Sequence, residues 1–113
     1  MKKIGGIGNE DLQSIKVTKF DGTQYELILN FRFATNCWYM TVIDRAVVIK
    51  NIKVVTCPNL LRQFDSYFDF GIACLTENLV DPRFIDDFLF ERSVLYTLTP
   101  EDVLSYEESL ANG

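Results

Sequence analysis

The sequence contains no histidine among its 113 residues. This absence removes the side chain that most often acts as a general base near neutral pH, and the commonest protein ligand of transition metals. It also excludes the Ser–His and Cys–His pairs that activate nucleophiles in many hydrolases. The sequence has no glycine-rich phosphate loop that leads into a helix. We therefore expect no catalytic residues, no metal site, no cofactor and no small-molecule substrate.

Cysteine is scarce and its spacing is irregular. The three cysteines, Cys37, Cys57 and Cys74, form no Cys-x-x-Cys pair. A disulfide framework or a zinc site would need cysteines in pairs. Each of the three has apolar neighbours instead. We therefore expect reduced, buried thiols in a protein made in a reducing cytoplasm.

Long apolar runs are also missing. No stretch approaches the ~20 residues that a membrane span requires. After Met1–Ile4, glycines and polar residues replace the apolar core that a secretory signal would need. We expect neither a membrane span nor a secretory signal. With 48% hydrophobic residues, the chain can still bury the core of one small domain.

Basic residues are rare in the second part of the chain. Residues 1–63 carry nine Lys/Arg and five Asp/Glu, a net charge of +4, whereas residues 64–113 carry two Arg and eleven Asp/Glu, a net charge of −9. The overall charge of −5 argues against sequence-specific nucleic-acid binding, because such binding depends on clustered cations. The uneven split could orient copies head to tail in a ring. Ordinary solvated surface charge would give the same pattern.

Alternating apolar and polar residues predict several strands. Residues 14–20 alternate, and Asp21-Gly22 then predicts a tight hairpin turn. The next strand is predicted most clearly, because five apolar side chains occupy every second position. They are Tyr25, Leu27, Leu29, Phe31 and Phe33.

The remaining strands are less regular. Residues 37–43 are apolar on both faces and predict a central strand. Residues 46–56 are rich in β-branched side chains, with an interruption at Asn51 that indicates a bulge or two short strands. Residues 68–75 read as a strand broken at Gly71, and residues 93–98 as the last strand.

Two helices are expected. Asn59 can cap a short helix near residues 60–64. Thr99-Pro100-Glu101-Asp102 predicts a helix start, with Val103, Tyr106 and Leu110 as its apolar stripe. Residues 77–87 predict an irregular segment.

Together these patterns predict a mainly β fold, a small antiparallel β-barrel or sandwich with a short helix near 60–64 and a C-terminal helix. We expect a flexible N-terminal arm at 1–10, a β-rich domain at 11–98, and a helix at 99–111 that is packed on the domain or extends from it.

Aromatic residues are the strongest candidates for contacts with other proteins, because aromatic side chains are favoured at the centres of interfaces. The same residues could equally fill a small β core. The candidates are Trp38, Tyr39, Phe64, Tyr67 and Phe68.

Acidic residues gather at Asp86 and Asp87, with Asp81 and Glu91 nearby. They lack the spacing of a calcium loop, so exposed turn-forming charge is the simpler interpretation. An enzyme that uses only carboxylates ranks last among the hypotheses.

The alternative function is a small-barrel module that binds single-stranded nucleic acid. Such a module stacks bases on aromatic side chains beside lysines. The candidate residues would be Tyr25, Phe31, Phe33 and Trp38 beside Lys16, Lys19, Lys50 and Lys53.

Several segments, taken in order, resemble the small baseplate plug proteins of contractile-tailed bacteriophages. The resemblance covers roughly residues 20–98 and depends on order and spacing. The segments are Asp21–Leu29, Cys37–Val42, Leu60–Phe64, Phe70–Leu75, Asp81–Phe88 and Val94–Tyr96. Two departures are Phe88–Arg92, where that family usually has glycine and basic residues, and a helix from Thr99 that extends past the usual end.

The resemblance implies a structural protein of the virion. Several copies, a homo-oligomer with three- or six-fold symmetry, would sit in the tail baseplate, between the central hub and the tail tube. They would plug the channel or join the two parts through protein–protein contacts. The loop with Asp86 and Asp87 would contribute to these contacts. Synthesis would take place in the host cytoplasm.

Overall fold

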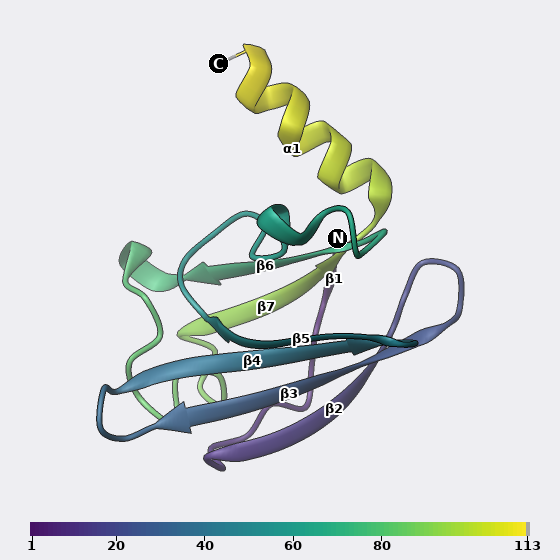
Figure 1. Ribbon diagram of the computed structural model, residues 1–113. Coiled ribbons are helices and arrows are strands. Elements are labelled where there is room, and N and C mark those ends of the chain that lie inside the picture. Colours follow the sequence, from purple (N-terminus) through teal and green to yellow (C-terminus); the bar gives the residue numbers. More distant parts are fainter. Residues whose placement is uncertain (113) are drawn as a thin grey trace.

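The computed structural model describes residues 1–112, with side chains described as far as residue 109. Two antiparallel sheets face each other in a sandwich-like arrangement, and the sheets do not close into a barrel (Figure 1). The larger sheet has the order β2-β3-β4-β5, so consecutive strands are neighbours. Its strands are β2 (Leu12–Thr18), β3 (Gln24–Arg32), β4 (Cys37–Asp44) and β5 (Val47–Lys53).

The smaller sheet has the order β1-β7-β6 and is built from distant parts of the chain. It combines β1 (Lys2–Lys3), β6 (Gly71–Thr76) and β7 (Ser93–Leu98). Two 3₁₀ turns, η1 (Arg62–Phe64) and η2 (Glu77–Leu79), lie before and after β6. The helix α1 (Pro100–Asn112) follows β7 directly. The predicted mainly β sandwich is confirmed.

The alternation in β3 is confirmed for four of its five apolar positions. Tyr25, Leu27, Leu29 and Phe31 point into the space between the sheets. Phe33 was expected on the same face, but β3 ends at Arg32 and Phe33 is 63% exposed. The chain turns directly after the strand, so the alternation in the sequence runs one residue further than the pairing with β4, which ends at Arg32 and Cys37.

The irregularity expected at Asn51 is a β-bulge. Met40 pairs with Ile52 while Val42 pairs with Ile49, so β5 carries one residue more than β4 in this interval. Asn51 adopts a positive φ of 60°, which asparagine tolerates better than most residues. The bulge leaves both Lys50 and Lys53 exposed on β5.

Residues 1–10 do not form the separate flexible arm that their composition suggests. Lys2 and Lys3 pair with Thr97 and Tyr96 of β7, and the Ile4 amide donates to the Leu95 carbonyl at 2.8 Å. Ile4 and Ile7 are buried in the core. A two-residue strand has no recognisable periodicity. The glycines between Ile4 and Ile7 are typical of a flexible segment, so the sequence does not indicate that this segment packs on the core.

The strand expected across residues 68–75 starts only at Gly71, so Gly71 begins the strand and does not interrupt it. A side chain there has no room, since a Cβ would lie 2.7 Å from Asn59 Oδ1. Asn59 is buried and its Oδ1 accepts hydrogen bonds from the amides of Leu61 and Ile72. This amide side chain therefore joins the expected short helical turn, observed as η1, to the start of β6.

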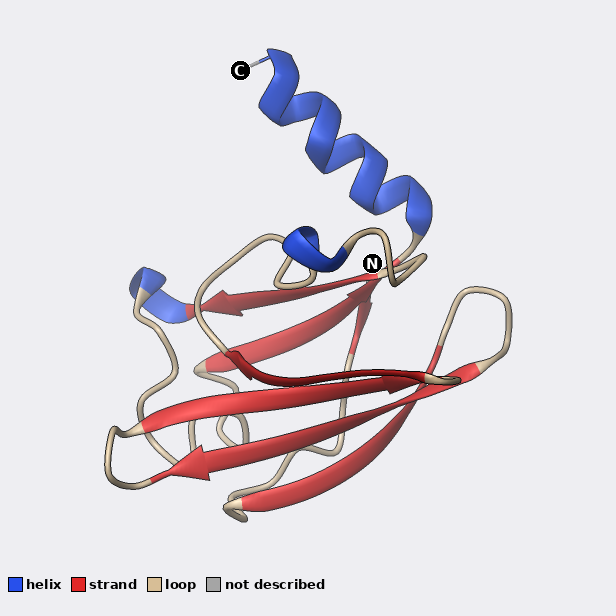
Figure 2. Cartoon of the chain, viewed as in Figure 1, coloured by secondary structure: helices blue, strands red, loops and turns tan. Residues whose placement is uncertain are grey.

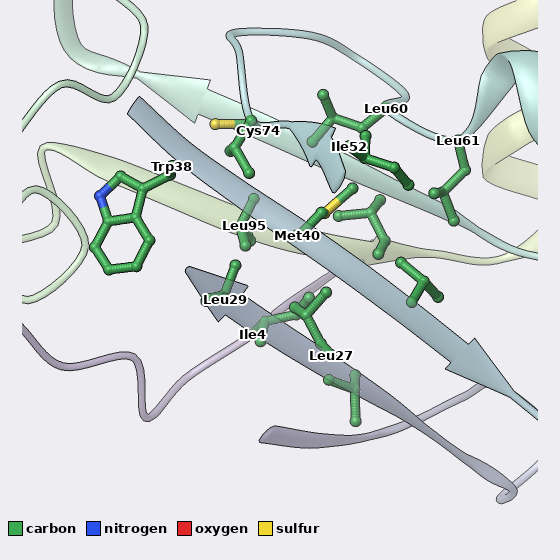
Figure 3. Close-up of a cluster of buried hydrophobic side chains, with 14 of the residues drawn as sticks. Ile4, Leu27, Leu29, Trp38, Met40, Ile52, Leu60, Leu61, Cys74 and Leu95 are labelled. Carbon is green, nitrogen blue, oxygen red and sulfur yellow. The ribbon is translucent and has the colours of Figure 1, made fainter. Parts of the chain in front are cut away.

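The core lies between the two sheets (Figure 3). Each large side chain buried there contributes about 1.5–3 kcal/mol to folding. Fully buried members come from both sheets and from the segment before η1, including Leu27, Leu29, Trp38, Met40, Leu61 and Leu95. One buried ion pair accompanies this core, with Lys19 Nζ 3.1 Å from Asp44 Oδ2 and 3.5 Å from Asp69 Oδ1.

Helix α1 extends away from the sandwich (Figure 2). Its start matches the expected capping box: the Asp102 amide donates to Thr99 Oγ1, and the Thr99 amide donates to Asp102 Oδ2, each at 3.1 Å. Val103 and Tyr106 are half-buried, as their predicted stripe requires, whereas the Leu110 side chain lies outside the described residues. Among the described helices, none has the length and apolar character needed to cross a bilayer.

Candidate partner-contact surface

The seven residues predicted to contact partners do not gather on one surface. Trp38, Phe68 and Asp87 are buried inside the folded chain, so within a single chain they present no exposed surface to a partner. Tyr67 is 58% exposed, in the loop before β6. The remaining three, Tyr39, Phe64 and Asp86, are half-buried.

Trp38 instead fixes the long connection between β6 and β7, residues 77–92, which we name the excursion. Its ring is fully buried, and its Nε1 donates a hydrogen bond to the Phe84 carbonyl at 3.1 Å. The ring also makes an edge-to-face contact with Phe88, with centroids 5.4 Å apart. Trp38, a core residue of the larger sheet, thereby holds in place the loop that connects two strands of the smaller sheet.

Asp87 connects different parts of the excursion through hydrogen bonds. Its carboxylate accepts hydrogen bonds from the amides of Arg83 and Phe84, each at 2.8 Å, and from Arg92 Nε at 2.7 Å. Burial alone would raise the pKa of this carboxyl, but the Phe84 amide, the Arg92 guanidinium and the Arg83 amide together lower the pKa below its usual value. Asp87 is therefore an ionised structural residue.

Asp86 also pairs with Arg92, so neither aspartate of the pair is a free acid. Within the part of the chain that the structure describes, no group of three or more Asp, Glu or Cys side chains lies close enough to hold a metal ion. The arrangement of the acids thus organises a loop around a guanidinium group.

The excursion presents apolar side chains to solvent. Phe84 and Phe90 are 52% and 62% exposed, and the Arg92 guanidinium lies 5.9 Å and 5.6 Å from their ring centroids. Arg92 is in turn fixed by the two aspartates. A pre-organised apolar surface of this kind is suited to protein contacts. We name the exposed set the excursion patch: Leu79, Val80, Phe84, Leu89 and Phe90.

Sequence reasoning missed this patch. The signal was present as Phe88-Leu89-Phe90, a run of large apolar residues in a segment with no strand or helix pattern. Only the fold shows that Phe88 turns inward, where it is 5% exposed, while Phe90 turns outward.

A second concave surface runs along β5. This β5 groove has a volume of about 720 Å³ and separates the strand from η1 and α1. Its apolar floor includes Ile52, Val55, Leu60 and Phe64, so the half-buried Phe64 lies in the groove. Lys50 and Lys53 supply positive charge on the strand side. The far side is formed by α1 itself, where Glu107 pairs with Arg62 at 2.9 Å.

The residues suggested for stacking nucleic-acid bases are mostly unavailable. Tyr25, Phe31 and Trp38 are buried, and Lys19 is buried in its ion pair. Of the proposed aromatic platform, Phe33 alone is exposed. The structure therefore offers no row of exposed rings at these positions, and such a row is what sequence-tolerant binding of single strands requires.

Comparison with protein families gives a match over most of the chain. A family model described as cyanophage baseplate Pam3 plug gp18 matches residues 1–100. The matched region contains both sheets and the excursion, and it ends at the first residue of α1. A comparison with curated proteins found no match.

Proposed function

The chain belongs to the cyanophage baseplate Pam3 plug gp18 family, and from this premise we propose that it plugs or joins the central hub and tail tube of a contractile phage tail. The family description makes it a structural protein of the phage baseplate. Its location would be the tail of the virion, after synthesis in the host cytoplasm. Several copies would act together, with three- or six-fold symmetry, through protein–protein contacts alone.

The observation that carries this proposal is the excursion patch. Phe84 and Phe90 are exposed and both lie near Arg92, and Trp38 and Asp87 hold the loop in place. Because the loop is already ordered, it would lose little conformational entropy when a partner covers these rings. We propose that the patch contacts the hub or tail tube.

The proposal is tested by replacing both exposed rings, in the variant Phe84→Ser/Phe90→Ser. The incorporation of the variant into tails should fall by about tenfold or more, because aromatic anchors at interfaces often contribute ~2 kcal/mol or more each. The amount of the protein in purified tails and the infectivity of the phage are the measurements. Far-UV circular dichroism confirms that the variant folds.

A matched control removes equally exposed apolar side chains elsewhere. Leu12 and Phe20 are 62% and 52% exposed, close to the values of the two patch rings. The variant Leu12→Ser/Phe20→Ser should enter tails normally. Normal tails with the patch variant would refute the role of the excursion, and normal tails without the protein would refute the proposed function.

A further inference from the structure

Helix α1 presents an unusual face to solvent. Glu101, Leu104 and Glu108 are spaced three and four residues apart and so share one side of the helix. Leu104 is 59% exposed, and a carboxylate lies about one turn before and after it. The opposite side carries the half-buried Val103 and Tyr106. We name the exposed side the outer face of α1.

The charge of this helix is of one sign. Residues 100–109 carry four acids, Glu101, Asp102, Glu107 and Glu108, and no Lys or Arg. Two of these are already engaged, because Asp102 pairs with the terminal amine at 3.0 Å and Glu107 pairs with Arg62. Glu101 and Glu108 of the outer face form no ion pair within the described residues. They remain available to a basic partner surface.

The β5 groove complements this face in charge. Its floor is apolar, and Lys50 and Lys53 are exposed beside it. Glu101 and Glu108 are separated by about 10.5 Å along a helix. Lys50 lies in the bulged interval of β5, so Lys50 and Lys53 are closer together than the about 10 Å of three regular strand residues, and their long side chains would have to spread to meet both carboxylates. Leu104, between the two acids, would then lie over the floor.

A helix cannot fill the groove of its own chain with this face. Tyr106, on the opposite side of α1, and Glu107, at the edge between the two sides, line the groove from within the same chain. The outer face therefore points away from the groove of its own chain. A helix that docks in this groove through its outer face must come from another molecule.

We propose that the outer face of α1 docks in the β5 groove of a second copy of this chain. Leu104 contacts the apolar floor, while Glu101 and Glu108 pair with Lys50 and Lys53. The docking face and the groove are different surfaces, so the contact is head to tail and generates a ring or a chain of copies. The inference rests on the proposed function only in that several copies act together. The docking helix lies almost entirely beyond the region that the family model matches.

The test uses two charge-reversed forms of the full chain. One form carries Glu101→Lys/Glu108→Lys on the helix, and the other carries Lys50→Glu/Lys53→Glu on the groove. Sedimentation velocity at rising protein concentration should show self-association of the unaltered protein, weakened by added salt. Each reversed form should self-associate with an affinity at least about tenfold lower, because like charges then face each other.

Mixing the two reversed forms gives the decisive result. The lysines of the reversed helix can pair with the glutamates of the reversed groove, so the mixture should associate where neither form does alone. Lys2→Glu/Lys16→Glu, which changes the net charge by the same amount as the groove reversal, is the matched control and should associate normally. Circular dichroism checks the fold of each form.

Three results would overturn the inference. The first is an unaltered protein that remains monomeric at low salt over the whole concentration range. The second is a mixture that fails to associate. The third is unchanged self-association in reversed forms that no longer enter tails, which would assign the groove to another baseplate protein. None of them depends on the excursion patch, so the two proposals fail separately.

Discussion

The carboxylate of Asp87 is the clearest case of a single residue that organises a surface. It joins the Arg83 and Phe84 amides to the Arg92 guanidinium, and Arg92 in turn lies beside both exposed rings of the excursion patch. Loss of one buried carboxylate should therefore disturb residues that it does not touch.

Replacement of Asp87 by Asn should destabilise the protein by about 1–3 kcal/mol, because amide donors and a guanidinium group would lose a charged acceptor. The pKa of Asp87 is lowered in the folded chain. Its contribution to stability is therefore present above about pH 4 and lost as the pH falls through the folded-state pKa. Urea unfolding from about pH 3 to about pH 7 measures both effects. Parallel pH profiles for the variant and the unaltered protein would contradict the assignment.

The sequence identified Trp38 and Asp87 as candidate contact residues, but it could not show whether their side chains point into the core or towards solvent. Both residue types serve interfaces and interiors equally well, and the choice depends on what lies opposite each side chain. For Trp38 the partners are Phe84 and Phe88, almost fifty residues away. No local pattern carries that information.

At the scale of elements, the sequence was informative wherever a strand was long enough to repeat its pattern. The bounds of the last strand, β7, match the expectation, as does the central position of β4. β1 was missed because two residues cannot show a period. The sequence predicts that the strand at Gly71 begins three residues earlier than it does. Phe68 and Phe70 resemble strand residues because they are apolar, but they are buried in the core without belonging to β6.

Helix α1 depends strongly on its first turn, because the helix packs little against the sandwich (Figure 1). Replacement of Thr99 by Ala removes the oxygen that accepts from the Asp102 amide and should cost the helix about 1 kcal/mol. Far-UV circular dichroism should show less helix. Ser105→Ala, an exposed change inside the helix, should leave the signal equal or higher. Equal spectra for Thr99→Ala and the unaltered chain would show that the cap is dispensable.

At the scale of the whole molecule, the buried Lys19 connects parts of the chain that are distant in sequence. Lys19 follows β2, Asp44 ends β4 and Asp69 precedes β6, so the network joins the larger sheet to the start of the smaller one. The desolvation of Lys19 is offset only while its partner carboxylates remain.

Replacement of Asp44 by Ala should therefore destabilise the fold by about 3–5 kcal/mol, because the ammonium group keeps only the weaker contact with Asp69. The double variant Lys19→Met/Asp44→Leu should recover most of this loss, since it removes both buried charges. Guanidinium unfolding gives both free energies. Equal losses in the single and double variants would show that packing, and not charge, is responsible.

The class of fold followed from strand spacing and tight turns, and the sequence predicted it correctly. The arrangement of the second sheet did not follow, because it pairs residues 2–4 with residues 95–97. Strand pairing between residues so distant in the chain produces no local sequence pattern from which it could be predicted.

That pairing also orders events during synthesis. β2 to β5 are consecutive and can form a meander while later residues are still being translated. β1 has no partner until β7, which follows β5 and β6 along the chain, has also left the ribosome. The residues of β1 thus take their place in the sheet only after β2 to β5 can already have paired with one another.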